Sequence, residues 1–317
     1  MTRLDLPAAQ ALFRQATADP TDGRVEAAEK VLRGMLDGGV HGPDLHYMLG
    51  YAVLAQGRYE EGFRHYQARR NIPAFGIALP PFPNPRWAGE SLVGKRLLVW
   101  PEQGFGDQIM FSRFALALAR AGASITLAVP RPLVRLFEGT PVAIRATDQS
   151  MEVAGYDYVA LAGDLPGLCH ATVEALPPPW PIKGTPGAPR GRIGVVASGD
   201  PKHPNDANRS LPPDLAARLL ALPGAISLRP EDTGAQDFQA TADLIAGLDL
   251  VISVDTATAH LAASMGKPTW ILIPHQRTDW RWLRDRKDSP WYPSARLWRQ
   301  NRPDDWTDVI EAILQAV

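Results

Sequence analysis

The stretch LVISVDTATAH, Leu250–His260, decides the fold of this 317-residue chain, and the run LAASMGKP continues from it to Pro268. Apolar and β-branched residues end at Asp255, and small and hydroxyl-bearing residues then lead directly into a helical pattern. This order predicts a strand, a tight turn and a helix with an exposed N-terminus. Backbone N–H groups and the helix dipole favour anions at such a terminus, so the stretch predicts an anion-binding site.

The same order of elements occurs in residues 96–130, RLLVWPEQGFGDQIMFSRFALALARAGASITLAVP. Its pattern predicts a strand over Arg96–Trp100, a helix over Gln108–Ala121 and a second strand over Ser124–Val129. One such unit in each half of the chain predicts two nucleotide-binding α/β domains that face each other. We expect a ligand in the cleft between them.

The composition is that of an ordinary globular protein, with 45% hydrophobic and 21% charged residues. The net charge of −1 gives no reason to expect nucleic acid or an anionic membrane as the main partner. Cys169 is the single cysteine, which excludes a disulfide framework and a cysteine-rich metal site. No apolar run reaches the roughly 18–20 residues of a membrane-spanning helix, and residues 1–15 lack the apolar core of a signal peptide. We therefore expect a cytoplasmic protein without a transmembrane segment.

The chain divides into three parts: a helical region over residues 1–75, a linker with a first Rossmann-like domain over 76–187, and a second Rossmann-like domain with a C-terminal helix over 188–317. Residues 45–70 resemble a tetratricopeptide repeat, with Leu49-Gly50 at the close helix contact and Gly57 in the turn. One such repeat cannot bury its own face, so we expect these helices to dock on the next domain. Helices are predicted in this region over Ala8–Ala16, Arg24–Leu36, Asp44–Gln56 and Tyr59–Arg70.

Strands and helices alternate through the rest of the chain, which predicts parallel sheets covered by helices on both faces. In the first domain we also expect a helix over Pro132–Glu138 and strands near Val142–Arg145 and Tyr156–Leu161. In the second domain we expect strands over Arg192–Ala197, Ala225–Leu228, Leu250–Val254 and Thr269–Ile273, and helices over Pro213–Leu222, Thr241–Gly247, Ala257–Met265 and Asp305–Ala316.

The glycine-containing run EQGFGD, residues 102–107, follows the first predicted strand. Gly104 and Gly106 allow the backbone to approach a bound group closely, and Gln103 lies beside them. Asp107 then stands at the start of the next helix, where an ionised carboxylate is favoured and could take a proton from a hydroxyl group. The alternative is that Asp107 only caps the helix.

A polar loop follows the first predicted strand of the second domain, at the edge where open α/β sheets bind ligands. Lys202 and Arg209 could contact a diphosphate, with Asn205, Asn208 and Ser210 as hydrogen-bonding partners. The alternative is a solvated loop in which Ser210 caps the next helix.

The opening stretch supplies a third group of candidate residues. Thr256 and the backbone amides of Thr256, Ala257 and Thr258 would hold a phosphate, while Asp255 would bind sugar or ribose hydroxyls. The alternative makes Asp255 the helix cap and His260 a half-buried packing residue.

Five of the nine tryptophans lie in residues 278–306, interleaved with arginines. One or two of them, with Trp282 as the candidate, could stack on a ligand, whereas the others would pin an irregular segment onto the sheet. The chain has no Asp-x-Asp pair, Walker loop, Gly-x-Ser-x-Gly elbow or His/Cys cluster. We therefore expect neither a metal nor a cofactor.

Taken in order, these four strings resemble the bacterial proteins that join tetratricopeptide repeats to a heptosyltransferase-like (family nine type) glycosyltransferase module. The resemblance runs from about residue 45 to the end of the sequence and implies an α/β fold of the GT-B type, a pair of Rossmann-type parallel-sheet domains after a short all-α region. It implies a catalytic aspartate at Asp107. It also implies a phosphate- and sugar-contacting D-T-x-x-x-H motif at Asp255, Thr256 and His260, with a basic contact at Lys202 or Arg209.

The expected function is therefore metal-independent, inverting transfer of a sugar from a nucleotide-diphosphate sugar to a glycan or protein acceptor. One alternative is a weakly active or inactive nucleotide-sugar-binding adaptor whose helices recruit a partner protein. Another is a sugar-nucleotide epimerase, because that class shares the GT-B fold.

Overall fold

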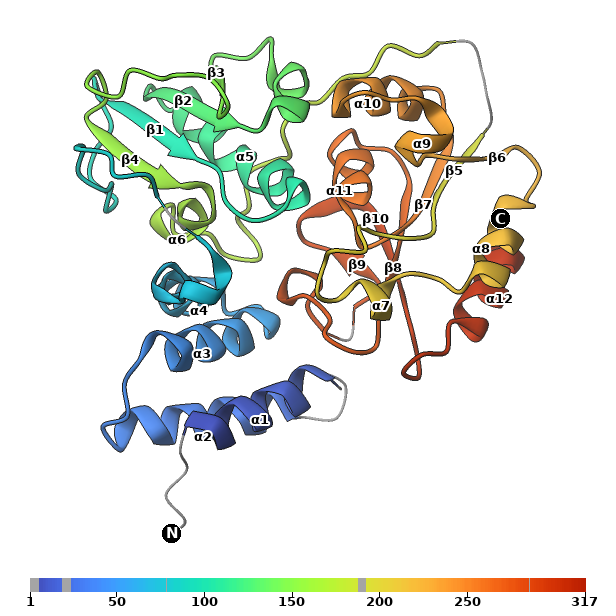
Figure 1. The fold of residues 1–317 in the computed structure, drawn as a ribbon, viewed down its shortest axis with the longest axis horizontal. Helices are drawn as coiled ribbons and strands as arrows, with labels where there is room; N and C mark the ends of the chain where they lie inside the picture. The colour runs from blue at the N-terminus through green and yellow to red at the C-terminus, as the bar shows by residue number, and fades with distance from the viewer. Residues whose placement is uncertain (1–5, 19–23, 78, 188–191, 285) are drawn as a thin grey trace.

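The computed structural model describes residues 6–18, 24–77, 79–187, 192–284 and 286–317. The strands of these residues form two sheets side by side, and the N-terminal helices lie below the first sheet and reach toward the second (Figure 1). Within the described part of the chain, no helix is both long and apolar enough to cross a membrane.

The N-terminal region is helical, as predicted, and its central helix pair packs closely. A Cβ atom at Gly50 would lie 2.6 Å from the backbone nitrogen of Tyr66, and one at Gly62 would lie 2.6 Å from Cγ of Leu54. The predicted close contact at Gly50 is thus confirmed, while the repeat assignment stays a prediction. The elements are α1 (Leu6–Ala18), α2 (Arg24–Asp37), α3 (Pro43–Ala55), α4 (Tyr59–Tyr66), η1 (Gln67–Asn71) and η2 (Pro73–Phe75).

The first sheet is parallel, with the strand order β3-β2-β1-β4. The strands predicted at Arg96–Trp100 and Ser124–Val129 are confirmed to the residue. Its elements are β1 (Arg96–Trp100), α5 (Phe105–Arg120), β2 (Ser124–Val129), β3 (Ala143–Ala146), β4 (Tyr158–Leu161), η5 (Ala162–Asp164) and α6 (Leu165–Leu168).

The helix predicted over Pro132–Glu138 is wrong. The chain forms two short 3₁₀ turns instead, η3 (Arg131–Leu133) and η4 (Arg135–Phe137). Leu133, Leu136 and Phe137 are all buried, and backbone hydrogen bonds here join residues three apart, as from Phe137 N to Val134 O. Packing of these side chains has therefore selected the tighter turn over an α-helix.

The second sheet has the order β6-β5-β7-β8-β10-β9, parallel except for its last strand. The strand β10 was not predicted, because its tryptophan- and arginine-rich sequence resembled an irregular segment. In the structure, Tyr292, Ala295 and Leu297 of β10 are buried, and it pairs with β8. The elements are β5 (Ile193–Val196), α7 (Asp206–Arg209), α8 (Pro213–Leu220), β6 (Ala225–Ser227), α9 (Pro230–Thr233), α10 (Phe238–Ala246), β7 (Leu250–Val254), α11 (Ala257–Ser264), β8 (Thr269–Ile273), η6 (Trp280–Trp282), β9 (Asp288–Ser289), β10 (Tyr292–Arg299) and α12 (Thr307–Ala316).

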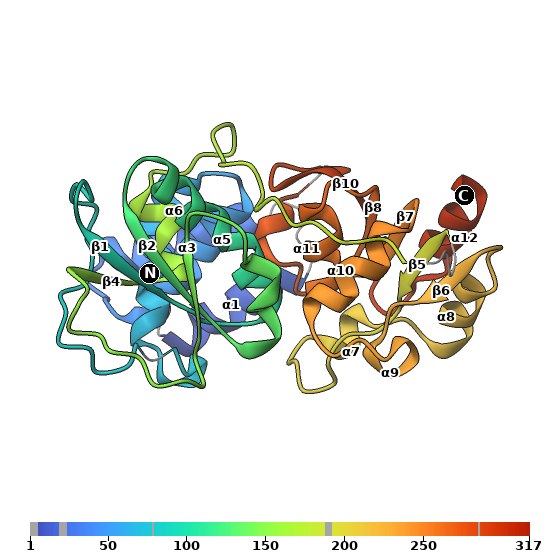
Figure 2. The same cartoon turned by 90° about the horizontal axis from the view of Figure 1, so that it is seen from above.

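One hydrophobic core runs through all three parts of the chain. It joins Phe63 of α4, Phe114 of α5, and Trp280 and Trp291 of the second sheet region. The helices α5 and α11 contact each other and lie between the two sheets (Figure 2). The N-terminal helices therefore dock on the rest of the molecule, as expected, although they also share a small core of their own that includes Leu32, Leu49 and Val53.

Candidate active site

The two predicted helix N-termini meet between the sheets. α5 follows β1, α11 follows β7, and the first turn of each helix contacts the other. A Cβ atom at Gly106 would lie 2.7 Å from Cδ2 of His260 and 3.4 Å from Cα of Ala257, so only a glycine allows this approach. The contact brings the EQGFGD run and the Asp255–His260 motif, predicted on separate domains, into one site.

Asp107 lies at the third position of α5, because the helix cap is Gly104. Its Oδ2 accepts a hydrogen bond from the Gly104 amide (3.0 Å), and its Oδ1 accepts one from Nη2 of Arg281 (2.5 Å). The carboxylate is 15% exposed. Asp107 is therefore not the N-cap residue itself, but it contributes to capping through a capping box with the Gly104 amide. Its two oxygens are oriented by groups from both halves of the molecule.

Arg281 is the main site residue that sequence reasoning missed. Its buried guanidinium contacts Asp107, donates from Nε to Oδ1 of Asp279 (2.8 Å), and places Nη1 3.4 Å from Nε2 of His260. Burial alone would lower the pKa of Arg281, but Asp107, Asp279 and Asp255 together raise it well above its usual value. The sequence offered one indication of this role, which is that Arg281 stands between two tryptophans.

His260 is 2% exposed, and its Nδ1 lies 2.8 Å from the hydroxyl of Tyr292. Burial, reinforced by the charges of Arg281 and Arg113, lowers the pKa of His260 well below its usual value, so the ring is neutral near pH 7. Arg281 can only donate a hydrogen bond, so Nε2 presents its lone pair and Nδ1–H donates to Tyr292. The structure thus places the ring behind Arg281, away from solvent.

The carboxylate of Asp255 is 20% exposed, and its Oδ2 accepts a hydrogen bond from Nε1 of Trp282 (2.9 Å). Burial raises the pKa of Asp255 to about 6, against the opposing effect of Arg281. Trp282 itself is fully buried, so its ring offers no open face to a ligand and instead orients Asp255.

The cap of α11 is Thr256, and not Asp255 as the alternative prediction had it. The Thr256 hydroxyl lies 3.1 Å from that of Ser253 and makes no capping hydrogen bond. The amides of Thr256, Ala257 and Thr258 have no acceptor within the helix, because the first N–H groups of a helix have no helical carbonyl one turn before them. They are the donors that an anion would meet.

The loop before α8 is held against this turn. Arg209 donates from Nη1 to the backbone oxygen of Asp255 (2.7 Å) and from Nε to Asp206 (3.1 Å). The Ser210 hydroxyl accepts a hydrogen bond from the Gly199 amide (3.0 Å). Because the cap of α8 is Pro212, Ser210 fastens the loop and does not cap that helix.

The two asparagines of this loop face the segment before Arg281. Nδ2 of Asn205 donates to the backbone oxygen of Arg277 (3.2 Å), and Nδ2 of Asn208 donates to the side chain of Asn205 (2.6 Å). Lys202 lies at the exposed end of the loop, where its ammonium group contacts none of the described residues. The loop thus brings Asn205, Asn208 and Arg209 together and leaves Lys202 apart.

The N-terminal helices position the glycine-containing run. Gln103 has a positive φ of 61° and donates from Nε2 to the hydroxyl of Tyr66 (3.0 Å). The preceding Glu102 is buried and accepts hydrogen bonds from Nε of Arg69 (3.0 Å) and from the Gly163 amide (2.7 Å). A residue held in the left-handed region at such a point is typical of functional turns.

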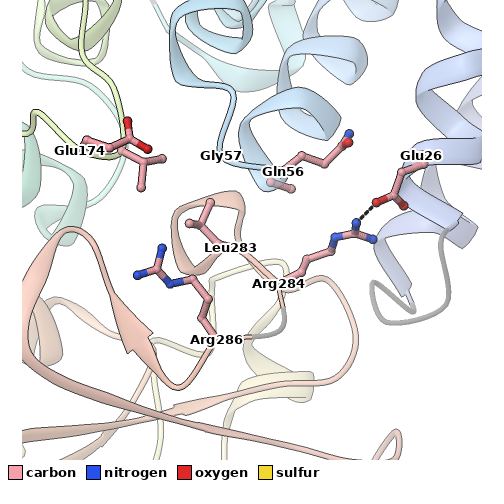
Figure 3. Close-up of a pocket in the computed structure, with 9 residues that line it drawn as sticks. Glu26, Gln56, Gly57, Glu174, Leu283, Arg284 and Arg286 are labelled. Atoms are coloured by element: carbon pink, nitrogen blue, oxygen red, sulfur yellow. Dashed lines mark hydrogen bonds and ion pairs between the residues drawn. The ribbon is translucent and has the colours of Figure 1, made fainter.

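A pocket of about 430 Å³ lies outside this site, where α2, the α3–α4 turn and the segment after η6 meet (Figure 3). Arg284 pairs with Glu26, and Arg286 forms a double hydrogen bond with Asp288 (2.8 and 2.7 Å). None of the predicted site residues lines it. Separately, no group of three or more His, Cys, Asp or Glu residues among those described could hold a metal ion.

Residues 233–297 match the family model described as Glycosyltransferase family 9 (heptosyltransferase). The matched range includes β7, α11 and η6, and therefore Asp255, His260 and Arg281. This part of the chain is thus similar to glycosyltransferases.

The chain is 27% identical over 322 residues to Protein FlbA of Caulobacter vibrioides, an alignment that covers 84% of this chain and 53% of that protein. The chain therefore spans about half the length of this relative. Among solved structures, it is similar to the glycosyl transferase family 9 from Veillonella parvula, with a TM-score of 0.44, 13% identity, and coverage of 71% of this chain and 91% of that one. It is also similar to the ADP-heptose lps heptosyltransferase II of E. coli, with a TM-score of 0.43, 14% identity, and coverage of 64% and 89%.

Proposed function

We propose that this chain is a glycosyltransferase that moves a sugar from a nucleotide-diphosphate sugar to a hydroxyl group of a glycan or protein acceptor. Transfer is inverting and needs no metal ion. The observation that carries the proposal is the junction of Asp107 on α5 with the first turn of α11 through Arg281. The glycosyltransferase family 9 match over residues 233–297 supports it.

The donor diphosphate binds at the N-terminus of α11, where the amides of Thr256, Ala257 and Thr258 have no acceptor within the helix. Arg209 stands on the neighbouring loop against Asp255 and neutralises the charge that develops on the leaving group. Lys202, which lies apart at the exposed end of that loop, supplies a further positive charge. Asp255, oriented by Trp282, accepts hydrogen bonds from sugar or ribose hydroxyls.

The acceptor binds on the α5 side, beside Asp107. The carboxylate takes the proton of the acceptor hydroxyl, whose oxygen attacks the anomeric carbon while the bond from that carbon to the diphosphate oxygen breaks. Each carboxylate oxygen has a lone pair beyond the one that Gly104 or Arg281 uses, so the proton can be accepted without breaking either hydrogen bond. Attack on the face opposite the leaving group inverts the configuration.

The adaptor alternative requires helices that are available to a partner protein. Tyr59, Phe63 and Tyr66 of α4 instead pack on Trp280, next to Arg281. This packing favours an enzyme in which the helical region supports the site.

The test is calorimetric titration with ADP, UDP, GDP and CMP and their common sugar conjugates, with and without EDTA. Binding of one nucleotide diphosphate that survives EDTA and is lost in Asp255→Ala is the expected result. Asp249→Asn is the matched control, because Asp249 is an exposed carboxylate whose side chain, among the described residues, pairs with Arg192 alone. Absence of binding by every nucleotide would overturn the proposal.

A further inference from the structure

Three tyrosines of α3 and α4 lie against the loops of the candidate site. The hydroxyl of Tyr51 donates to the backbone oxygen of Thr278 (2.9 Å), the residue before Asp279. The hydroxyl of Tyr66 accepts a hydrogen bond from Nε2 of Gln103 (3.0 Å). The ring of Tyr47 contacts both, with centroid distances of 6.2 Å to Tyr51 and 5.7 Å to Tyr66. Tyr47 is therefore flanked by residues tied to both site loops.

Tyr47 also contacts Phe75, with ring centroids 4.7 Å apart, and Phe75 is 43% exposed. The Tyr47 hydroxyl makes no hydrogen bond to a described residue. Burial raises the pKa of the Tyr47 phenol well above its usual value, and the nearby charges of Asp279 and Asp107 raise it further. Tyr47 thus lies within electrostatic reach of the two carboxylates, and the Phe75 ring packs against Tyr47.

The polar groups around these rings are acceptors of hydrogen bonds. Asp279 accepts a hydrogen bond from Arg281 through Oδ1. Its Oδ2 remains available as an acceptor for a ligand, because the side chain is partly exposed. Gln103 is exposed and donates one N–H to Tyr66, which leaves its amide oxygen as an acceptor and its second N–H as a donor for a sugar hydroxyl. Acceptor oxygens suit the hydroxyls of a sugar, and an aromatic ring suits the C–H face of its ring. Arg281 balances one of the two negative charges of Asp107 and Asp279, and the negative charge that remains disfavours a phosphorylated or carboxylated ligand.

We propose that Tyr47, Phe75, Gln103 and Asp279 form the acceptor subsite and bind an uncharged, hydroxylated sugar ring with one hydroxyl directed at Asp107. This inference rests on the proposed glycosyltransferase function and adds to it the chemical class of the acceptor. It also gives the N-terminal helices a part in choosing the substrate.

The experiment is saturation-transfer NMR on the full chain with methyl β-D-glucopyranoside and methyl β-D-galactopyranoside, compared with glucose 6-phosphate. We expect transfer to the ring C–H protons of at least one glycoside and a weaker response from the phosphate ester. Phe75→Ser and Tyr47→Phe remove an exposed ring and a hydroxyl, respectively. Each is expected to weaken binding about fivefold, roughly the contribution of one aromatic contact or one hydrogen bond. Leu220→Ser is the control, because Leu220 is similarly exposed (41%) on the distant α8.

Thermal unfolding midpoints equal to that of the natural chain establish that the variants are folded. A response to no glycoside, an equal loss in Leu220→Ser, or a preference for glucose 6-phosphate would each overturn the subsite. The nucleotide titration separates this failure from that of the parent proposal. Nucleotide binding without glycoside binding removes only the subsite. Glycoside binding without nucleotide binding removes the transferase assignment and, with it, the acceptor role of the sugar-binding residues.

Discussion

Arg281 connects three parts of the candidate site that are far apart in the sequence. It contacts Asp107 from the first sheet region, Asp279 from its own segment and His260 from α11. Asp107 and Asp255 could be predicted, because each follows an apolar strand at the edge where parallel sheets bind ligands. Arg281 could not, because its role depends on contacts with residues up to 174 positions away in sequence. Likewise, the burial of His260 and Trp282 follows from packing that no local pattern records.

Asp107→Asn is expected to lower the rate of sugar transfer by about 10²- to 10⁴-fold, because an amide cannot accept the proton of the acceptor hydroxyl. Nucleotide binding should stay within about twofold, since Asp107 lies on the acceptor side. Arg281 keeps Asp279 as its partner, so the free energy of unfolding should fall by about 1–3 kcal/mol. Steady-state transfer assays beside urea denaturation check both effects, with Asp249→Asn as the control. Unchanged transfer would refute the role of Asp107 as base.

Asp255 should make stability depend on pH. Its pKa of about 6 in the folded chain lies above the usual 3.8, so folding disfavours the ionised form. This destabilisation is complete above about pH 6 and disappears as the pH falls toward 4. Asp255→Asn removes this destabilisation, so the variant should be the more stable protein at pH 7. Its advantage in free energy of unfolding over the natural chain should shrink by on the order of 2 kcal/mol between pH 7 and pH 4.5.

Urea denaturation of both proteins at several pH values measures this difference. His260 is present in both proteins, and its own loss of stability below about pH 6.5 therefore cancels from the comparison. A difference that is constant across the range would contradict the raised pKa of Asp255.

At the scale of elements, the contact of α5 with α11 depends on Gly106. Gly106→Ala would place a Cβ atom 2.7 Å from the buried His260 ring and so force the two helix N-termini apart. We expect the free energy of unfolding to fall by about 1–3 kcal/mol, together with a loss of transfer. Gly34→Ala is the matched control in α2, since its Cβ meets nothing within 4 Å, and it should stabilise the chain by up to about 1 kcal/mol. Equal effects of the two substitutions would count against the close approach.

Strands with uniform apolar sequence were the easiest elements to predict. β1, β2, β7 and β8 match their predicted bounds, because both faces of a central parallel strand are buried and the run of apolar residues marks its length. β10 lies toward the edge of its sheet, where buried residues alternate with exposed ones such as Arg296. The alternation could not be recognised in the sequence, because arginines and a tryptophan interrupt the run of apolar residues. The segment 131–137 carries a helical spacing of apolar residues, but tertiary packing favoured 3₁₀ turns.

At the scale of the whole molecule, a buried ionic network joins the helical region to the first sheet. Arg69 of η1 donates hydrogen bonds to two buried carboxylates. One is Glu102 (3.0 Å), which lies two residues after the end of β1, and the other is Asp164 of η5 (2.9 Å). Burial raises the pKa of Glu102 even though Arg69 opposes this shift. The network lies directly behind Gln103, so the helices fix the loop that carries Asp107.

Arg69→Met should therefore lower the free energy of unfolding by about 3–5 kcal/mol, because it leaves Glu102 buried without its cation. Arg131→Met is the control: Arg131 forms a similar two-bond pair with Asp148, but on the exposed surface, and its loss should change stability by at most about 1 kcal/mol. Chemical denaturation measures both. A small effect of Arg69→Met would mean that the buried ionic network contributes little to holding the helices.

The segment Trp280–Trp282 tolerates no change in the number of its residues, because the side chains at both of its ends are anchored. Trp280 is packed among the aromatic rings of α4, and Trp282 is held beside Asp255 and His260. Arg281 reaches Asp107 because a single residue separates these two anchors. Insertion or deletion of one residue here would release an anchor or turn the guanidinium away. Related chains with this arrangement should therefore differ in the segment by substitution, with changes in length confined to the loops on either side.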